Sequence, residues 1–277
     1  MTDQRIVVRH PTFDFEDLPR HWIGGNRWLT HSGNAGHVFI PLGEDFFVDT
    51  VKGFRDDVED PDLRRDVRGF IGQESVHRRA HAALWDQLRA DGVPVDRFAS
   101  VIATIRSLEA HLPATFRLSV TAALEHYTAA FGSAFLTEDL HDAVPDEMAR
   151  LLAWHGLEEL EHRSVAFDVL RSVDGRYSMR LAGFAFATGL IVVVPTIGSV
   201  MFTVADLTGP GGEPERPTEQ SEQPMTSPVA LAGMSARLLR RMGTHLVDYL
   251  RPSFHPGQMA EPPEMAGWAL RMTDSTT

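Results

Sequence analysis

The sequence feature that most constrains this chain is a pair of Glu-x-x-His motifs. The first spans residues 74–77 (Glu-Ser-Val-His) and the second spans residues 159–162 (Glu-Leu-Glu-His). On an α-helix, residues i and i+3 share one face, so each motif directs a carboxylate and an imidazole toward the same point. A single motif of this kind is usually a solvated ion pair, whereas two of them in one chain indicate a shared site.

Two further glutamates occupy matching positions ahead of the motifs. Glu44 precedes Glu74 by 30 residues, and Glu125 precedes Glu159 by 34. Both lie among apolar residues, where a carboxylate without a partner is costly. A helical bundle that holds two metal ions takes one Glu from each of two helices and one Glu-x-x-His from each of the other two. The pattern therefore predicts an all-α fold built on a ferritin-like four-helix bundle. The predicted metal ligands are Glu44, Glu74, His77, Glu125, Glu159 and His162.

The rest of the chain also has a helical pattern. Proline, glycine and acidic residues interrupt the apolar periodicity and predict helices over about 41–57, 61–91, 95–112, 113–136 and 145–173. We expect an N-terminal arm over 1–35, the bundle over 36–173 and a C-terminal extension over 174–277. The extension is predicted to contain an apolar helix over 181–205, a flexible loop over 208–228 and a terminal helix over 229–250.

Composition removes several classes of site. The 277-residue chain contains no cysteine, which excludes disulfides, thiolate metal sites, iron–sulfur clusters and cysteine nucleophiles. A metal ion must then be held mainly by His, Asp or Glu, which suit Fe, Mn or Zn. The formal net charge of −12 argues against nucleic acid as a partner. The first ten residues carry charges and no apolar run, so we expect no signal peptide and a cytoplasmic protein.

The ordered set of Glu, Glu-x-x-His, Glu and Glu-x-x-His resembles the ferritin-like di-iron carboxylate proteins. Residues 70–77 (FIGQESVH), 154–162 (WHGLEELEH) and 249–256 (YLRPSFHP) look like a bacterial family labelled "predicted metal-dependent hydrolase". The likeness covers most of the chain, from about residue 8 to residue 257. It implies that the two motifs belong to a metal centre.

Two further histidines share the ligand faces. His155 lies four residues before Glu159, and this His-x-x-x-Glu-x-x-His arrangement resembles the di-iron N-oxygenases that act on aryl amines, in which an additional His joins the site. His81 lies four residues after His77 and has no counterpart in that pattern. Each is expected to bind metal or to orient a ligand, and the alternative is a hydrogen-bonded core histidine. Glu158 and Glu161 lie about 100° off the ligand face, so we expect them outside the ligand set.

The resemblance to the di-iron proteins implies a non-haem di-iron oxygenase or oxidase that activates O2 to oxidise a small apolar or aromatic substrate. Two iron ions are the expected cofactors, with Mn or Zn as alternatives, and an external electron donor of unknown identity is required. Two metal ions about 3.5–4 Å apart can also activate water, so a dimetal hydrolase is the first alternative. Metal binding without catalysis is the second alternative.

The apolar stretch 181–205 contains 25 residues without a charge, and about 20 apolar residues suffice to cross a bilayer. Pro195 and the glycines Gly183, Gly189 and Gly198 interrupt it. A span would also export the basic helix that follows, which the positive-inside tendency disfavours. We expect a kinked, fully buried helix or helical hairpin against the bundle, with a homodimer interface as one option. Contact with a membrane surface and a true span are the alternatives.

Overall fold

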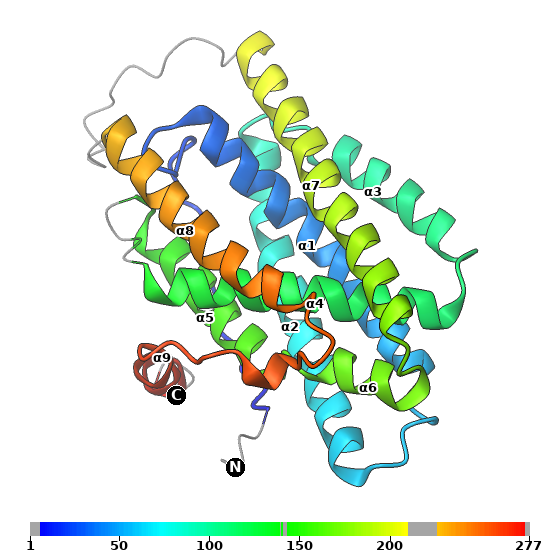
Figure 1. Cartoon of the computed structure of the whole chain (residues 1–277). Helices are drawn as coiled ribbons and strands as arrows, with labels where there is room; N and C mark the ends of the chain where they lie inside the picture. The colour runs from blue at the N-terminus through cyan, green and yellow to red at the C-terminus, as the bar shows by residue number, and fades with distance from the viewer. Residues whose placement is uncertain (1–5, 139, 141–142, 210–225, 275–277) are drawn as a thin grey trace.

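The structure is a computed structural model that describes residues 6–138, 140, 143–209 and 226–274. All regular structure in these residues is helical, which confirms the all-α prediction. The elements, shown in Figure 1, are α1 (Arg27–Gly53), α2 (Pro61–Ala90), α3 (Val95–Glu109), α4 (Ala114–Thr137), α5 (Asp146–His162), α6 (Val165–Val173), α7 (Tyr177–Thr208), α8 (Pro228–Asp248), the 3₁₀ turn η1 (Pro256–Gln258) and α9 (Met265–Asp274).

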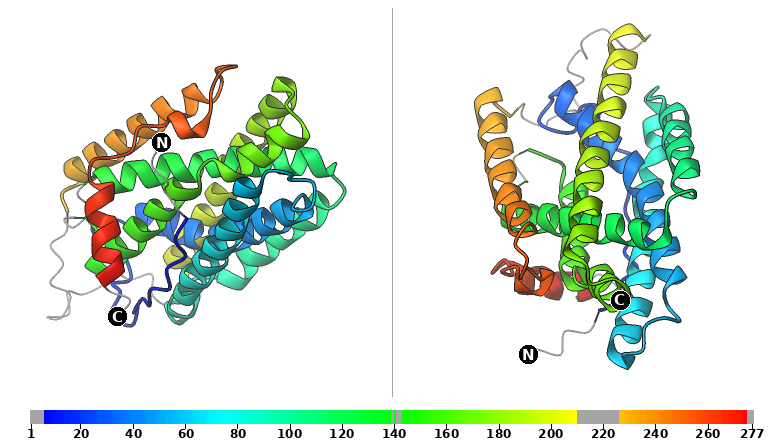
Figure 2. Two further views of the ribbon diagram at one scale, coloured as in Figure 1. Left: turned by 90° about the horizontal axis from the view of Figure 1, so that it is seen from below. Right: turned by 45° about the vertical axis from the view of Figure 1, so that its right-hand side comes forward.

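Four helices carry the predicted ligands, and they pack together as two pairs. Helix α1 packs along α2, α4 packs on α5, and the two pairs also contact each other. Helix α3 lies against α1, while the long helix α7 covers both α1 and α4 (Figure 1). Figure 2 shows that α8 and the pair α2 and α3 lie on opposite sides of the molecule. This packing places the ligand-bearing faces in the centre.

Helix α1 begins much earlier than the sequence suggested. Asn26 caps it by accepting a hydrogen bond from the backbone N–H of Leu29, so the expected arm to residue 35 and the expected start near Pro41 are wrong. Pro41 lies inside the helix and cannot donate to the carbonyl of His37. The indole N–H of Trp85 donates to that carbonyl instead, at 3.1 Å. A helix interior tolerates a proline when a neighbour satisfies the freed carbonyl in this way.

The expected helix over 145–173 is divided in two. Arg163 and Ser164 separate α5 from α6, directly after the second Glu-x-x-His motif. The buried guanidinium of Arg163 donates to the carbonyl of Leu160 and, at 3.2 Å, to the carbonyl of Pro256. The break therefore connects the end of α5 to the C-terminal segment, a long-range contact that local sequence periodicity does not encode.

Helix α7 is one continuous helix of 32 residues. Its glycines do not interrupt it: a Cβ atom on Gly183 would lie 2.6 Å from the backbone of Ser119, and one on Gly198 would lie 2.6 Å from the ring of Phe98. The glycines therefore allow close packing on α4 and α3. Helix α7 is long and apolar enough to cross a membrane, and 28% of its most apolar 18-residue window is buried. The expectation of a fully buried helix or hairpin is wrong, because one face is exposed.

The C-terminal part agrees in outline with the prediction. Helix α8 covers most of the expected range 229–250. The expected loop over 208–228 falls mainly on residues 210–225, which lie outside the described residues. Helix α9 was not predicted.

The N-terminal segment reaches the core through two glycines of α2. A Cβ atom on Gly69 would lie 2.8 Å from Ile6, and one on Gly72 would lie 2.7 Å from Val8. The absence of side chains there lets residues 6–9 lie close against α2. The extended segment consequently carries Arg9 into the interior of the protein, where its side chain is only 8% exposed.

Candidate metal centre

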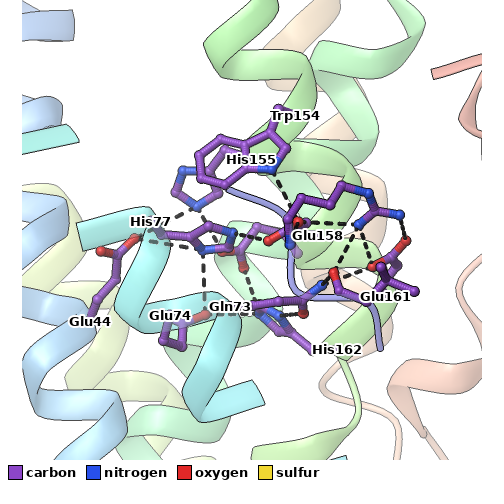
Figure 3. A network of polar contacts seen from close by, with 12 residues as sticks. Glu44, Gln73, Glu74, His77, Trp154, His155, Glu158, Glu161 and His162 are labelled. Atoms are coloured by element: carbon purple, nitrogen blue, oxygen red, sulfur yellow. Dashed lines mark hydrogen bonds and ion pairs between the residues drawn. The ribbon is translucent and has the colours of Figure 1, made fainter. Parts of the chain in front are cut away.

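The structure brings all six predicted ligands and His155 into one buried region. They come from α1, α2, α4 and α5, and Figure 3 shows several of them converging between these helices. His155 is the most exposed of the seven, at 8%. These acids and imidazoles thus share a core position that only strong mutual interactions can stabilise.

The donor atoms form two adjacent groups. Atoms of Glu44, His77 and His155 lie within 4.8 Å of one another in the first group. The second group meets the same limit and contains four residues: Glu74, Glu125, Glu159 and His162. Each group offers carboxylate oxygen and imidazole nitrogen, the donors that suit iron, manganese or zinc.

Two glutamates connect the groups. Glu159 directs Oε1 toward Nε2 of His155, at 2.7 Å, and Oε2 toward Nε2 of His162, at 3.4 Å. Oε1 of Glu74 lies 3.6 Å from Nδ1 of His77 and 3.1 Å from Nε2 of His162. Glu74 and Glu159 would therefore contact metal ions held by either donor group.

Many buried polar atoms of the cluster make no hydrogen bond, and this indicates whether the cluster suits metal ions. Nine buried donor or acceptor atoms in the cluster make no hydrogen bond to the described part of the chain. They are both carboxylate oxygens of Glu44, Glu74 and Glu125, Oε2 of Glu159, Nδ1 of His77 and Nε2 of His162. Buried polar atoms are normally paired, and lone pairs that converge without hydrogen-bond geometry are suited to a cation. The residues therefore fit a pair of divalent metal ions.

The electrostatics of the metal-free cluster point the same way. Burial, together with the charge of Glu74, raises the pKa of Glu125 to about 8 and that of Glu44 well above its usual range. Burial alone would lower the pKa of His162, but the charge of Glu159 and contacts with Glu125 raise it well above its usual range. Without metal the cluster must therefore hold protons to balance its charge, and divalent ions can replace them.

Hydrogen bonds behind the cluster set the orientation of His77. Its Nε2–H donates to Oε2 of Glu158 at 3.0 Å, which leaves Nδ1 facing the acids. Glu158 also accepts from the indole of Trp154 at 3.1 Å and from the guanidinium of Arg9 at 3.2 Å. The expectation that Glu158 lies outside the ligand set agrees with this position, and Figure 3 shows it on the far side of His77.

His162 is oriented by Gln73. The Nδ1–H of His162 donates to Oε1 of Gln73 at 2.8 Å, so Nε2 faces the second group. The amide of Gln73 in turn donates to Oε2 of Glu161 at 2.8 Å, and Arg9 pairs with both oxygens of Glu161. Arg9 thus contacts both Glu158, which binds His77, and Glu161, which binds the Gln73 that holds His162.

His155 is supported by a chain of two more imidazoles. Its Nδ1 contacts Nε2 of His81, and Nδ1 of His81 lies 2.7 Å from Nδ1 of His37. His81 belongs to neither donor group, and both of its ring nitrogens contact other histidines. His81 therefore lies behind His155 in the structure, and its role as a metal ligand or as an orienting residue stays a prediction.

Sequence inspection missed three residues around the cluster. Gln73 stands next to Glu74 in the first motif, and its position just before a ligand was the available signal. Arg9 and His37 lie far from the motifs in a region expected to be an arm or its boundary. Their roles depend on long-range packing, so no local pattern indicated them.

A third group of possible ligands lies outside this region. Donor atoms of His21, His31 and Asp206 also lie within 4.8 Å of one another. Arg20 and Arg27 both approach the same carboxylate to 2.6 Å, which already balances its charge. This group is therefore better described as an ion-pair cluster than as a metal site.

The helical fold and the buried Glu/His cluster define a class of protein: an all-α protein with a candidate carboxylate–histidine metal centre. A family model described as "predicted metal-dependent hydrolase" matches residues 7–260, so the chain belongs to that family. No curated protein and no solved structure matches the chain. Metal dependence thus has support from both the family description and the donor groups.

Proposed function

We propose that this protein is a two-metal enzyme whose ions are held by the four glutamates and by His77, His155 and His162. The observation that carries the proposal is the set of nine buried ligand atoms that converge from four helices without making a hydrogen bond in the described part of the chain. Four carboxylates offset the four positive charges of two divalent ions. A purely structural polar core would instead arrange these atoms in hydrogen bonds of normal geometry.

Hydrolysis is the reaction class that the family description supports. Two bound ions can lower the pKa of a water molecule and stabilise a leaving group. Here Glu158 and Gln73 would fix the orientation of the ligands. Glu158 binds Nε2 of His77 and Gln73 binds Nδ1 of His162, the ring nitrogens that face away from the cluster. The family description therefore favours the dimetal hydrolase, which was the first alternative in the sequence prediction, over the oxygenase.

Oxidation with O2 by two iron ions is a second candidate, favoured by the surroundings of the cluster. Six of the seven ligands are at most 3% exposed, which suits a small gaseous co-substrate better than a polar, hydrated one.

Metal analysis tests the proposal first. Purified protein should contain two metal ions per chain by mass spectrometry, and Glu74→Ala and Glu159→Ala should each lose most of that metal. Glu59→Ala removes an exposed glutamate as the matched control and should keep both ions. Two ions retained in both cluster variants would contradict the site.

A second experiment separates the two reaction classes. The protein is loaded with Fe(II), Mn(II) or Zn(II) and assayed with and without O2 on aryl esters, aryl phosphates and aryl amines. Turnover that persists anaerobically with Zn(II) or Mn(II) supports hydrolysis. O2 consumption coupled to amine oxidation, seen only with iron, supports oxidation. Stable metal binding without either reaction would support the non-catalytic alternative.

A further inference from the structure

A polar cavity lies away from the Glu/His cluster, where α6, the start of α7 and the segment after α8 meet. Its volume is about 240 Å³. The charged residues Arg171, Asp174, Arg176 and Arg180 line it together with aromatic side chains. Its lining includes Pro252, Ser253 and Phe254 of the third family-like stretch, which the metal centre does not use.

The buried arginine in this cavity has no anionic partner. Arg180 is 7% exposed, and no carboxylate in the described part of the chain lies within ion-pair distance of it. Its guanidinium donates to the carbonyls of Arg251, at 2.6 Å, and Phe254, at 3.4 Å, while its Nε has no hydrogen-bond partner there. Carbonyl groups and aromatic rings stabilise a cation but do not neutralise it, and buried charges are usually paired.

Other groups at the cavity add positive potential. Arg171 is exposed, and its side chain makes no ion pair or hydrogen bond within the described residues. The 32-residue helix α7 starts here, with no side-chain cap and no acidic residue in its first turn. Free backbone N–H groups and the helix dipole favour an anion at such a position.

One carboxylate also lines the cavity and is already neutralised. Asp174 forms a two-pronged ion pair with Arg176, with N–O distances of 2.9 and 2.6 Å, and it accepts the backbone N–H of Arg176 at 3.1 Å. The cavity therefore retains the charges of Arg171 and Arg180 in a chain whose net charge is −12. The local charge of the cavity is therefore positive, whereas the net charge of the whole protein is negative.

We propose that this cavity binds the anionic group of an organic phosphate or carboxylate, with Arg171, Arg180, Ser253 and the start of α7 as its donors. Phe167, Tyr177 and Phe254 form an apolar wall for the body of the ligand. Phosphate and carboxylate are recognised best by paired guanidinium and backbone N–H donors. The site is separate from the metal centre, so it does not depend on the reaction proposed above.

Calorimetric titration with phenyl phosphate, benzoate and inorganic phosphate tests the site in the full-length protein. We expect phenyl phosphate to bind, and Arg171→Gln to weaken its binding by about tenfold because one charge-assisted contact is lost. Ser253→Ala should weaken binding less. Arg171 is exposed, so its replacement should not unfold the protein. Arg240→Gln, on the exposed face of α8, is the matched control and should bind normally.

Two further experiments identify the source of the anion and show whether its binding depends on metal. Vesicles of phosphatidylglycerol that bind wild type but not Arg171→Gln, with phosphatidylcholine vesicles not bound, would assign the site to a lipid headgroup. Binding of phenyl phosphate without vesicle binding would assign it to a soluble ligand. The Glu74→Ala variant should still bind phenyl phosphate, whether or not the Glu/His cluster binds metal. The proposal is overturned if none of the anions or vesicles binds, or if Arg171→Gln and Arg240→Gln weaken binding equally.

Discussion

The Nε2 atom of His77 lies 3.0 Å from Oε2 of Glu158, on the side of the imidazole opposite the other glutamates. This contact fixes the proton on Nε2, so the lone pair of Nδ1 faces the cluster. Replacing Glu158 by Gln should keep the fold but weaken metal binding by roughly tenfold to a hundredfold, as loss of such supports usually does. Competition with a chelator of known affinity measures the change.

The matched control for this prediction is Glu147→Gln. Glu147 lies on the same helix but pairs with Arg150 near the surface. It should leave metal affinity unchanged. Equal metal affinity in Glu158→Gln and wild type would show that the contact does not orient a ligand.

Arg9 balances two buried acids at once. Its guanidinium lies 3.2 Å from Glu158 and 2.8 Å from Glu161, and all three side chains are at most 8% exposed. Arg9→Met should lower the free energy of unfolding by about 3–5 kcal/mol, because it leaves buried carboxylates unpaired. Urea denaturation at saturating metal measures this loss. Arg65→Gln breaks the exposed pair with Asp62 and should cost less than about 1 kcal/mol. Similar losses in both variants would contradict the assigned role.

His155 and His81 should respond differently to substitution. His155→Ala removes a donor from the first group and should reduce the metal content of the purified protein. His81→Asn removes only its support and should retain two ions, bound more weakly. Mass spectrometry of both variants makes the comparison. If His81→Asn lost metal while His155→Ala kept it, the roles would be reversed.

Helices α4 and α5 cross at two glycines. A Cβ atom on Gly156 would lie 2.8 Å from Cα of Gly132, and one on Gly132 would lie 2.6 Å from the carbonyl oxygen of Gly156. Gly156→Ala should therefore force the helices apart and destabilise the protein by about 1–3 kcal/mol. Gly36→Ala, inside α1 with open space around it, should be neutral or stabilising by up to about 1 kcal/mol. Thermal unfolding distinguishes the two, and an unchanged midpoint for Gly156→Ala would argue against this close contact.

Asp206 gives the protein a defined dependence on acid. Burial alone would raise its pKa, but hydrogen bonds from Arg20 and His21 and the close contact with His31 hold that pKa well below its usual range. Because the folded pKa lies below the unfolded value near 3.9, this stabilisation is present above about pH 4 and is lost as the pH falls further. Asp206→Asn should cost about 3 kcal/mol at pH 7 and progressively less below pH 4. Urea denaturation from pH 7 to 3 tests this, and a difference that stays constant with pH would refute it.

Much of the helical framework could be predicted from local sequence. Apolar periodicity and proline starts located α2, α3 and α4 to within a few residues. The same rules misplaced the start of α1, because Pro41 resembles a helix start when the partner of its freed carbonyl, Trp85, is unknown. They also joined α5 and α6, since the contacts of Arg163 that accompany the break come from the distant C-terminal segment.

The sequence by itself determined which side chains face the centre, because residues three apart on a helix share a face whatever surrounds them. The two Glu-x-x-His motifs follow from that spacing, and Glu44 and Glu125 follow from their apolar neighbours and their similar distances ahead of the motifs. Only the tertiary structure decided which nitrogen each histidine presents and which acids are balanced by Arg9. Those choices depend on hydrogen bonds between residues 81 to 152 positions apart, and helix periodicity carries no information about such contacts.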